Sequence, residues 1–151
     1  MPKHKDYHIR YRAVRALGET GDERFVGPLL EALGDFDTRD EESKVNRSAM
    51  FALVHIGEVA INPLIKALDK NPQHPNDGWR RYWVTQTLRI VKDKRAVEPL
   101  IRVLEDDDRE AIEGAAEALG EMGDMRAIET LTKVWARSEI SGYVLIAVSR
   151  A

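Results

Sequence analysis

The amino-acid sequence predicts an all-α fold, namely a solenoid of four helical hairpins followed by one terminal helix. Two apolar patterns alternate along the 151-residue chain, and each recurs every 29 to 36 residues. Within each pattern the apolar residues are spaced i, i+3, i+4 and i+7, which is the spacing of one face of an α-helix. A hairpin with one apolar side cannot bury that side alone, so neighbouring hairpins are expected to stack.

The first helix of each hairpin carries an apolar stripe that is rich in alanine. Its copies are the stretches RYRAVRALG, NRSAMFALV, RYWVTQTLR and EGAAEALGE, in which Leu17, Leu53, Leu88 and Leu119 align. The small alanines should let a neighbouring helix come close. The third copy is less apolar on this face, because Arg80 and Thr87 stand where the other copies have apolar residues.

The second helix of each hairpin is more strongly apolar. Its copies are GDERFVGPLLEAL, GEVAINPLIKAL, DKRAVEPLIRVL and GDMRAIETLTKVW, in which Leu29, Leu64, Leu100 and Leu131 align. Proline lies early in three of the four helices, at Pro28, Pro63 and Pro99. Each proline removes one backbone hydrogen bond and should bend its helix slightly.

The connections agree with this division of the chain. Gly21 and Gly123 suit the left-handed end of a first helix, and Asp22 and Asp124 suit the N-cap of the next helix. We therefore predict a single domain over residues 1–151. Its repeats are expected at about 6–34, 41–70, 78–105 and 108–136, with a closing helix at 138–150. That last helix has no second helix after it and is a candidate for self-association.

The stretches RAVEPLIRVLEDDD and AAEALGEMGDMRAIETL resemble HEAT repeats, specifically the short phycobilisome-lyase HEAT-like class. The resemblance covers residues 8–151. It implies a right-handed α-α superhelix whose second helices line the concave side, where partners usually bind. The same repeat serves lyase subunits, accessory domains of enzymes and interaction proteins, so the resemblance is specific for fold and leaves the function open.

Composition removes several classes of function. The net charge of −3 gives no general attraction to nucleic acid or to an anionic membrane. Cysteine is absent, which excludes thiolate catalysis and cysteine-ligated zinc and fits a cytoplasmic location. No window approaches 18 apolar residues, so we expect no membrane-spanning segment.

Motifs for catalysis, a metal or a cofactor are missing from the sequence. His4 and His8 have a metal-compatible spacing, but the HExxH pattern is absent and both lie in a terminal segment. The acidic run from Glu105 to Glu110 precedes a predicted helix, where carboxylates act as caps. We therefore expect no catalytic residue, no metal ligand and no cofactor.

Aligned positions of the second helices supply a first set of candidate partner-binding residues. On the side that the resemblance makes concave, these are Lys66, Glu98, Arg102, Glu129 and Lys133. Rows of like charge there could recognise an acidic peptide. The alternative is a solvated face, since Glu98–Arg102 and Glu129–Lys133 have the i, i+4 spacing of ion pairs within one helix.

A second candidate set lies in HPNDGWRRYWV, at one edge of the stack. Trp79, Arg80, Arg81 and Tyr82 are the expected exposed residues, because tryptophan, tyrosine and arginine are enriched at interface hot spots. Trp79 could instead staple the preceding loop to the helix, and the arginines could contact nucleic acid. Trp83 borders the core, and we expect it to fill the space beside Gly114 of the next repeat.

The function predicted from these observations is a non-catalytic scaffold or adaptor that binds another protein. One alternative is a subunit similar to bilin lyases, which would act on a phycobiliprotein. A nucleic-acid-binding module is the third reading, which the net charge of −3 disfavours.

Overall fold

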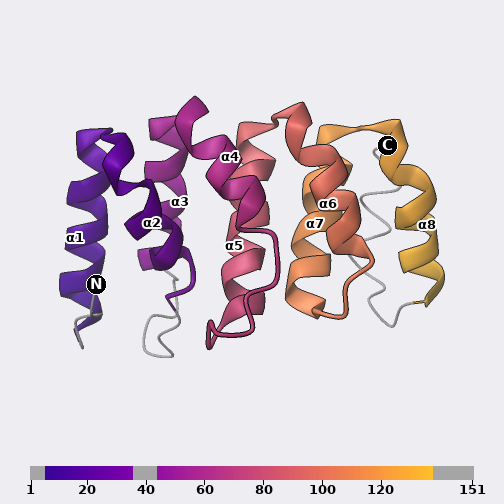
Figure 1. Ribbon diagram of the computed structural model, residues 1–151, viewed down its shortest axis with the longest axis horizontal. Coiled ribbons are helices and arrows are strands. Elements are labelled where there is room, and N and C mark those ends of the chain that lie inside the picture. Colours follow the sequence, from indigo (N-terminus) through magenta and orange to yellow (C-terminus); the bar gives the residue numbers. More distant parts are fainter. Residues whose placement is uncertain (1–5, 36–43, 138–151) are drawn as a thin grey trace.

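Eight α-helices follow one another through residues 6–35 and 44–137, the residues that the computed structural model describes (Figure 1). Short 3₁₀ turns, labelled η, precede three of them. In chain order the elements are α1 (Tyr7–Thr20), η1 (Glu23–Phe25), α2 (Val26–Leu33), α3 (Lys44–Ile56), α4 (Glu58–Lys66), α5 (Asp77–Val91), η2 (Lys94–Ala96), α6 (Val97–Leu104), α7 (Arg109–Met122), η3 (Met125–Ala127) and α8 (Ile128–Arg137).

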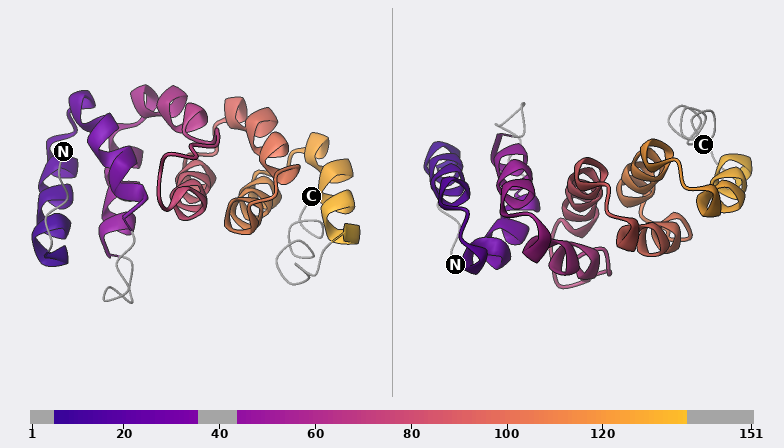
Figure 2. Two further views of the ribbon diagram at one scale, coloured as in Figure 1. Left: turned by 60° about the horizontal axis from the view of Figure 1, so that its bottom comes forward. Right: turned by 90° about the horizontal axis from the view of Figure 1, so that it is seen from above.

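The helices form two rows, with α1, α3, α5 and α7 as the first helices and α2, α4, α6 and α8 as the second helices (Figures 1 and 2). The predicted all-α solenoid of stacked helical hairpins is confirmed in the described part of the chain. The predicted closing helix at 138–150 lies outside the described residues, so its role in self-association stays a prediction. No helix in residues 6–35 and 44–137 is long and apolar enough to cross a membrane.

The two rows pack differently. Successive first helices contact one another far more extensively than successive second helices do. Both views in Figure 2 show a shallow arc with the second helices along its outer side. The concave placement of the second helices, which the resemblance implied, is therefore wrong for this chain, because the longer first helices are the ones that approach closely.

Small residues allow this close approach, as the alanine-rich stripe predicted. A Cβ atom added to Gly18 of α1 would lie 2.5 Å from the Cβ of Ala52 in α3. A Cβ atom added to Gly114 of α7 would lie 2.0 Å from the Thr85 Oγ1 of α5. Both glycines therefore set the distance between neighbouring first helices.

Each hairpin turns at the same aligned position, where the backbone has positive φ. Gly21, Gly57 and Gly123 occupy it in three hairpins, with φ of 64°, 78° and 64°, and Lys92 occupies it in the third hairpin with φ of 55°. A lysine in this region bears a steric penalty that glycine avoids, of about 1–2 kcal/mol. The turn geometry is thus kept even where the glycine is missing.

The caps after these turns are the predicted aspartates. Asp22 and Asp124 each accept a hydrogen bond from the backbone N–H two residues later, and Asp93 does the same in the third hairpin. They begin 3₁₀ turns, and the α-helices start three residues further on. Pro28 and Pro99 each lie in the first turn of an α-helix that follows a 3₁₀ turn, where the backbone N–H has no partner within that α-helix for proline to remove. Pro63 lies inside α4.

Candidate functional site

The side chains of the HPNDGWRRYWV stretch are largely buried, contrary to the predicted exposed edge site. The exposed fraction is 7% for Arg80 and 1% for Arg81. Trp79 and Tyr82 are partly buried and pack against the core. The expectation of exposure is wrong for both arginines, because each guanidinium is held by neighbouring acceptors.

Arg81 connects three elements. Its Nε donates to the carbonyl of Leu68 after α4 at 2.8 Å, and its Nη2 donates to Asp106 after α6 at 2.7 Å. Its Nη1 is buried without a hydrogen-bond partner in the described part of the chain. Arg80 is held by Asp77, with Nη2 2.7 Å from the carboxylate. Arg81 is therefore a fixed cation between repeats two and three.

The same arrangement recurs in the first hairpin. The Arg10 Nε lies 2.6 Å from the carboxylate of Asp35, and Arg10 and Asp35 align with Arg81 and Asp106. The sequence contained this signal as two Arg–Asp pairs, each 25 residues apart. In the second hairpin Asn46 occupies the arginine position, and its amide donates to the carbonyl of Leu33 at 2.6 Å.

The aromatic residues of α5 form one cluster. The Trp79 and Tyr82 rings stack with centroids 5.7 Å apart, and Trp83 meets both edge-on at 5.9 Å. Trp83 is buried, as the structural interpretation predicted. Its predicted position beside Gly114 is wrong, because Thr85 and Tyr82 are the side chains nearest to that glycine.

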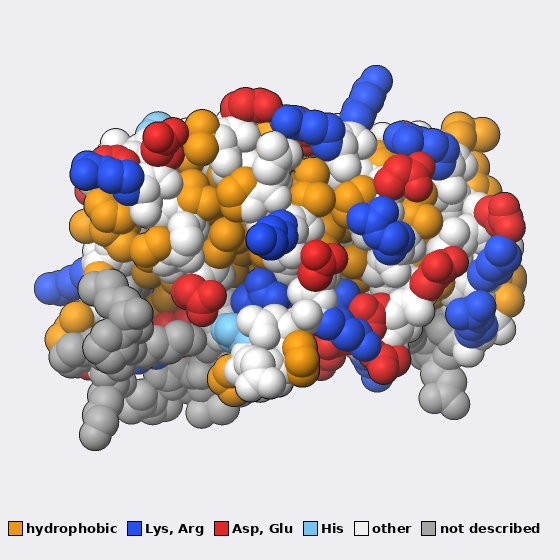
Figure 3. Space-filling view, in the orientation of Figure 1, with side chains coloured by type: hydrophobic (Ala, Val, Ile, Leu, Met, Phe, Trp, Pro, Cys, Tyr) orange, Lys and Arg blue, Asp and Glu red, His pale blue; other side chains and the backbone are white. Residues whose placement is uncertain are grey.

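The five candidate residues of the second helices are all exposed. On the face seen in Figure 3, basic and acidic side chains lie interspersed rather than in separate patches. The predicted pair Glu129–Lys133 is present at 2.6 Å. The predicted pair Glu98–Arg102 is replaced by a contact between repeats, in which Glu98 lies 3.1 Å from Arg126. Within residues 6–35 and 44–137, Lys66 and Arg102 have no ion pair.

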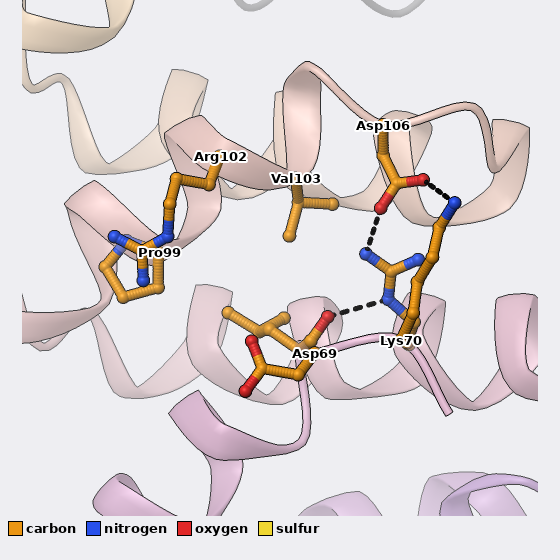
Figure 4. Close-up of a pocket in the computed structure, with 8 residues that line it drawn as sticks. Asp69, Lys70, Pro99, Arg102, Val103 and Asp106 are labelled. Atoms are coloured by element: carbon orange, nitrogen blue, oxygen red, sulfur yellow. Dashed lines mark hydrogen bonds and ion pairs between the residues drawn. The ribbon is translucent and has the colours of Figure 1, made fainter. Parts of the chain in front are cut away.

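Arg81 and Arg102, which belong to different candidate sets, line one pocket of about 210 Å³ (Figure 4). We call it the α4–α6 pocket, because it lies between the end of α4 and α6 with α5 behind it. Figure 4 shows Arg102 and Pro99 on one side, and Lys70 with Asp106 on the other. Its lining residues are Leu68, Asp69, Lys70, Arg81, Pro99, Arg102, Val103 and Asp106.

Some charged side chains of this pocket are already paired with one another, and Arg102 is not. Burial raises the pKa of Asp106, but hydrogen bonds from Lys70 and Arg81 outweigh it and hold the pKa below its usual value. Lys70 Nζ lies 2.8 Å from Asp106 and also contacts Asp107, and these two carboxylates raise the pKa of Lys70. Asp106 is thereby shared by two cations, whereas Arg102 has no ion pair with any described residue.

A second hollow, of about 430 Å³, lies between α1 and α3 on the row of first helices. Phe51 lines it and is 56% exposed. Arg15 and Glu19 on its rim pair with each other at 2.9 Å. This hollow therefore offers apolar surface but little unpaired charge.

The described side chains limit the chemistry that this part of the chain can offer. No group of three His, Asp or Glu side chains suited to a metal ion occurs in residues 6–35 and 44–137. Asp106, the carboxylate lining the α4–α6 pocket whose pKa is lowered, is already ion-paired. Among the described residues, the pocket supplies the unpaired guanidinium of Arg102, apolar walls and the buried guanidinium of Arg81.

Comparison with known proteins adds two family matches. A family model described as HEAT repeats matches residues 73–149, and one described as PBS lyase HEAT-like repeat matches residues 9–35 and 45–70. No curated protein matches the sequence.

Proposed function

Because the chain belongs to the HEAT-repeat family, in its PBS lyase HEAT-like class, we propose that it is a non-catalytic scaffold that binds another protein. The observation that carries this proposal is the exposed row on the second helices, where Lys66 and Arg102 have no ion pair with any described residue and Arg102 lines the α4–α6 pocket. Charged side chains left unpaired near a pocket are available to a partner without first breaking an internal contact.

The shape of the molecule supports a protein as the partner. The α4–α6 pocket, at about 210 Å³, is smaller than the roughly 300–1,000 Å³ of pockets that bury small molecules. Stacked hairpins instead present extended surfaces, which suit a partner that contacts several repeats. The residues of the HPNDGWRRYWV stretch lie beneath this surface and hold its hairpins together. Arg81 joins the end of α4 to the loop after α6 through hydrogen bonds to Leu68 and Asp106. Trp79 and Tyr82 pack against the core, and Arg80 is paired with Asp77.

A lyase-like subunit is the second candidate, because the PBS lyase HEAT-like model matches the first two hairpins. In that case the chain would act on a phycobiliprotein and hold a bilin, and the hollow between α1 and α3 is the larger site offered. A shift in the absorbance spectrum of a bilin on addition of the purified chain would favour this candidate. An unchanged spectrum would argue against bilin binding and favour the scaffold function.

The scaffold proposal is tested by capture of partners from the source organism, followed by reconstitution with each purified candidate. We expect a stoichiometric complex that the double variant Lys66→Glu, Arg102→Glu weakens. The matched control is Lys133→Glu, which reverses a charge on the same row at a lysine already paired with Glu129. Substrate turnover by the purified chain alone, or failure to reconstitute any protein complex, would contradict the proposal.

A further inference from the structure

We infer that the α4–α6 pocket receives an acidic side chain, Asp or Glu, from the protein partner, with Arg102 as its ionic contact. This inference rests on the proposed function and specifies the chemistry of the partner. The partner is thus a protein segment that presents an exposed carboxylate.

The lining of the pocket has a net positive charge, which favours an acidic group. Three cations, Lys70, Arg81 and Arg102, face two carboxylates, Asp69 and Asp106. The lining therefore has a net charge of +1, which one incoming carboxylate would neutralise. Asp106 is engaged by Arg81 at 2.7 Å and by Lys70 at 2.8 Å, so Arg102 is the cation left to bind.

The contacts between repeats explain why Arg102 is available. Glu98 lies one turn before Arg102 on α6, which is the favourable order for an ion pair within a helix. Glu98 instead contacts Arg126 of the next hairpin. The carboxylate of Asp124 lies 2.8 Å from the Nη2 of Arg126 and so holds this arginine near Glu98. On α8, the equivalent Glu129 does pair with its own Lys133. The stacking of hairpins three and four thus releases one guanidinium beside the pocket.

The size and walls of the pocket fit one side chain. A volume of about 210 Å³ corresponds to about seven water molecules at roughly 30 Å³ each. Leu68, Pro99 and Val103 supply apolar walls that can contact the methylene groups of a glutamate. The buried Arg81 fixes the floor, so little ordering of the site is required when a side chain enters.

A nucleic acid fits this surface less well than a carboxylate-bearing protein segment. Nucleic-acid binding draws on several phosphate contacts to free cations. Here Lys70, Arg126 and Lys133 are already paired, and the exposed carboxylates of Asp69 and Asp107 would repel neighbouring phosphates. A single carboxylate needs only one free cation, and Arg102 supplies it.

The test is a titration of the full chain with a short capped peptide of alternating alanine and glutamate, followed by NMR of the arginine Nε–H and backbone amides. We expect shifts at Arg102 and at residues that line the pocket. Arg102→Gln should weaken binding at least about tenfold, the effect of losing one charge-assisted hydrogen bond. Arg12→Gln, the same substitution at an exposed arginine of α1 that does not line the pocket, should change the affinity little. Thermal unfolding of both variants checks that they fold.

Three outcomes would overturn the inference. They are an absence of shifts at Arg102, equal binding of the peptide with glutamine in place of glutamate, and stronger binding of oligo-dT than of the acidic peptide. Failure of the inference and failure of the proposed function can be told apart. A reconstituted protein complex that tolerates Arg102→Gln contradicts only the inference, whereas no protein complex at all contradicts the function.

Discussion

Arg81 shows how an arginine can serve the interior of a repeat protein. Arginine is seldom fully buried unless it is paired, so a sequence pattern of two arginines among aromatic residues favours the surface. The pairing comes from Leu68 and Asp106, which lie 13 and 25 residues away. The burial of Arg81 therefore depends on contacts that only the stacked hairpins create.

At the residue scale we predict that Arg81→Ala destabilises the fold by about 3–5 kcal/mol, the usual effect of removing one partner of a buried ion pair. The variant leaves the Leu68 carbonyl and the Asp106 carboxylate without the guanidinium that both now share. Urea unfolding followed by circular dichroism measures the change. Arg102→Ala is the control, and we expect it to stay within about 0.5 kcal/mol because the side chain is exposed. Equal effects of the two substitutions would contradict a structural role for Arg81.

At the scale of elements, the helices were predictable and their rotations were not. Apolar periodicity is a local property, so the first and second helices fall where the repeated stripes placed them. The neighbour of Gly114 depends on how α5 is rotated against α7, and successive residues on a helix point in very different directions. The sequence therefore could not identify the side chain that packs against Gly114. The prediction named Trp83, whereas Thr85 and Tyr82 are the nearest side chains in the structure.

The close approach of α5 and α7 gives a prediction at this scale. Gly114→Ala should destabilise the fold by about 1–3 kcal/mol, because the new methyl group overlaps the Thr85 hydroxyl. Adding Thr85→Ala should recover part of the loss, since it removes the overlapping oxygen. Thermal and urea unfolding of the single and double variants measure both effects.

A matched control is available for this substitution. Gly27 lies in α2, and a Cβ atom added there would meet nothing within 4 Å. Gly27→Ala should therefore leave stability unchanged or raise it slightly, because alanine favours a helix over glycine. If both glycine variants lose the same stability, close packing is not what Gly114 provides.

At the scale of the whole molecule, the repeat alignment accounts for the solenoid but not for the candidate site. The alignment identifies equivalent positions within hairpins, and it therefore anticipated the exposed row of Lys66 and Arg102. The α4–α6 pocket and the Glu98–Arg126 contact join different hairpins. Their geometry depends on the distance and tilt between hairpins, which a one-dimensional alignment does not contain.

The repetition of one cap through the molecule leads to a pH dependence of stability. Asp22, Asp93 and Asp124 each have a pKa of about 2, lowered by side-chain and backbone hydrogen bonds from the arginine two residues later. A carboxyl whose pKa is lower in the folded than in the unfolded chain stabilises the fold above its unfolded pKa, near 3.9. That contribution is lost as the pH falls from about 4 to about 2, and it is lost in three hairpins at once.

The variant with Asn at all three positions isolates this effect, because asparagine caps a helix about as well as aspartate but does not titrate. We expect the urea midpoint of the wild-type chain to fall more steeply between about pH 5 and about pH 2.5 than that of the triple variant. High salt should narrow the difference, since all three carboxylates are near the surface and their pairing with arginine is screened. Parallel curves for the two proteins would show that acid sensitivity arises elsewhere, for example at Asp106, whose pKa is also lowered by its partners.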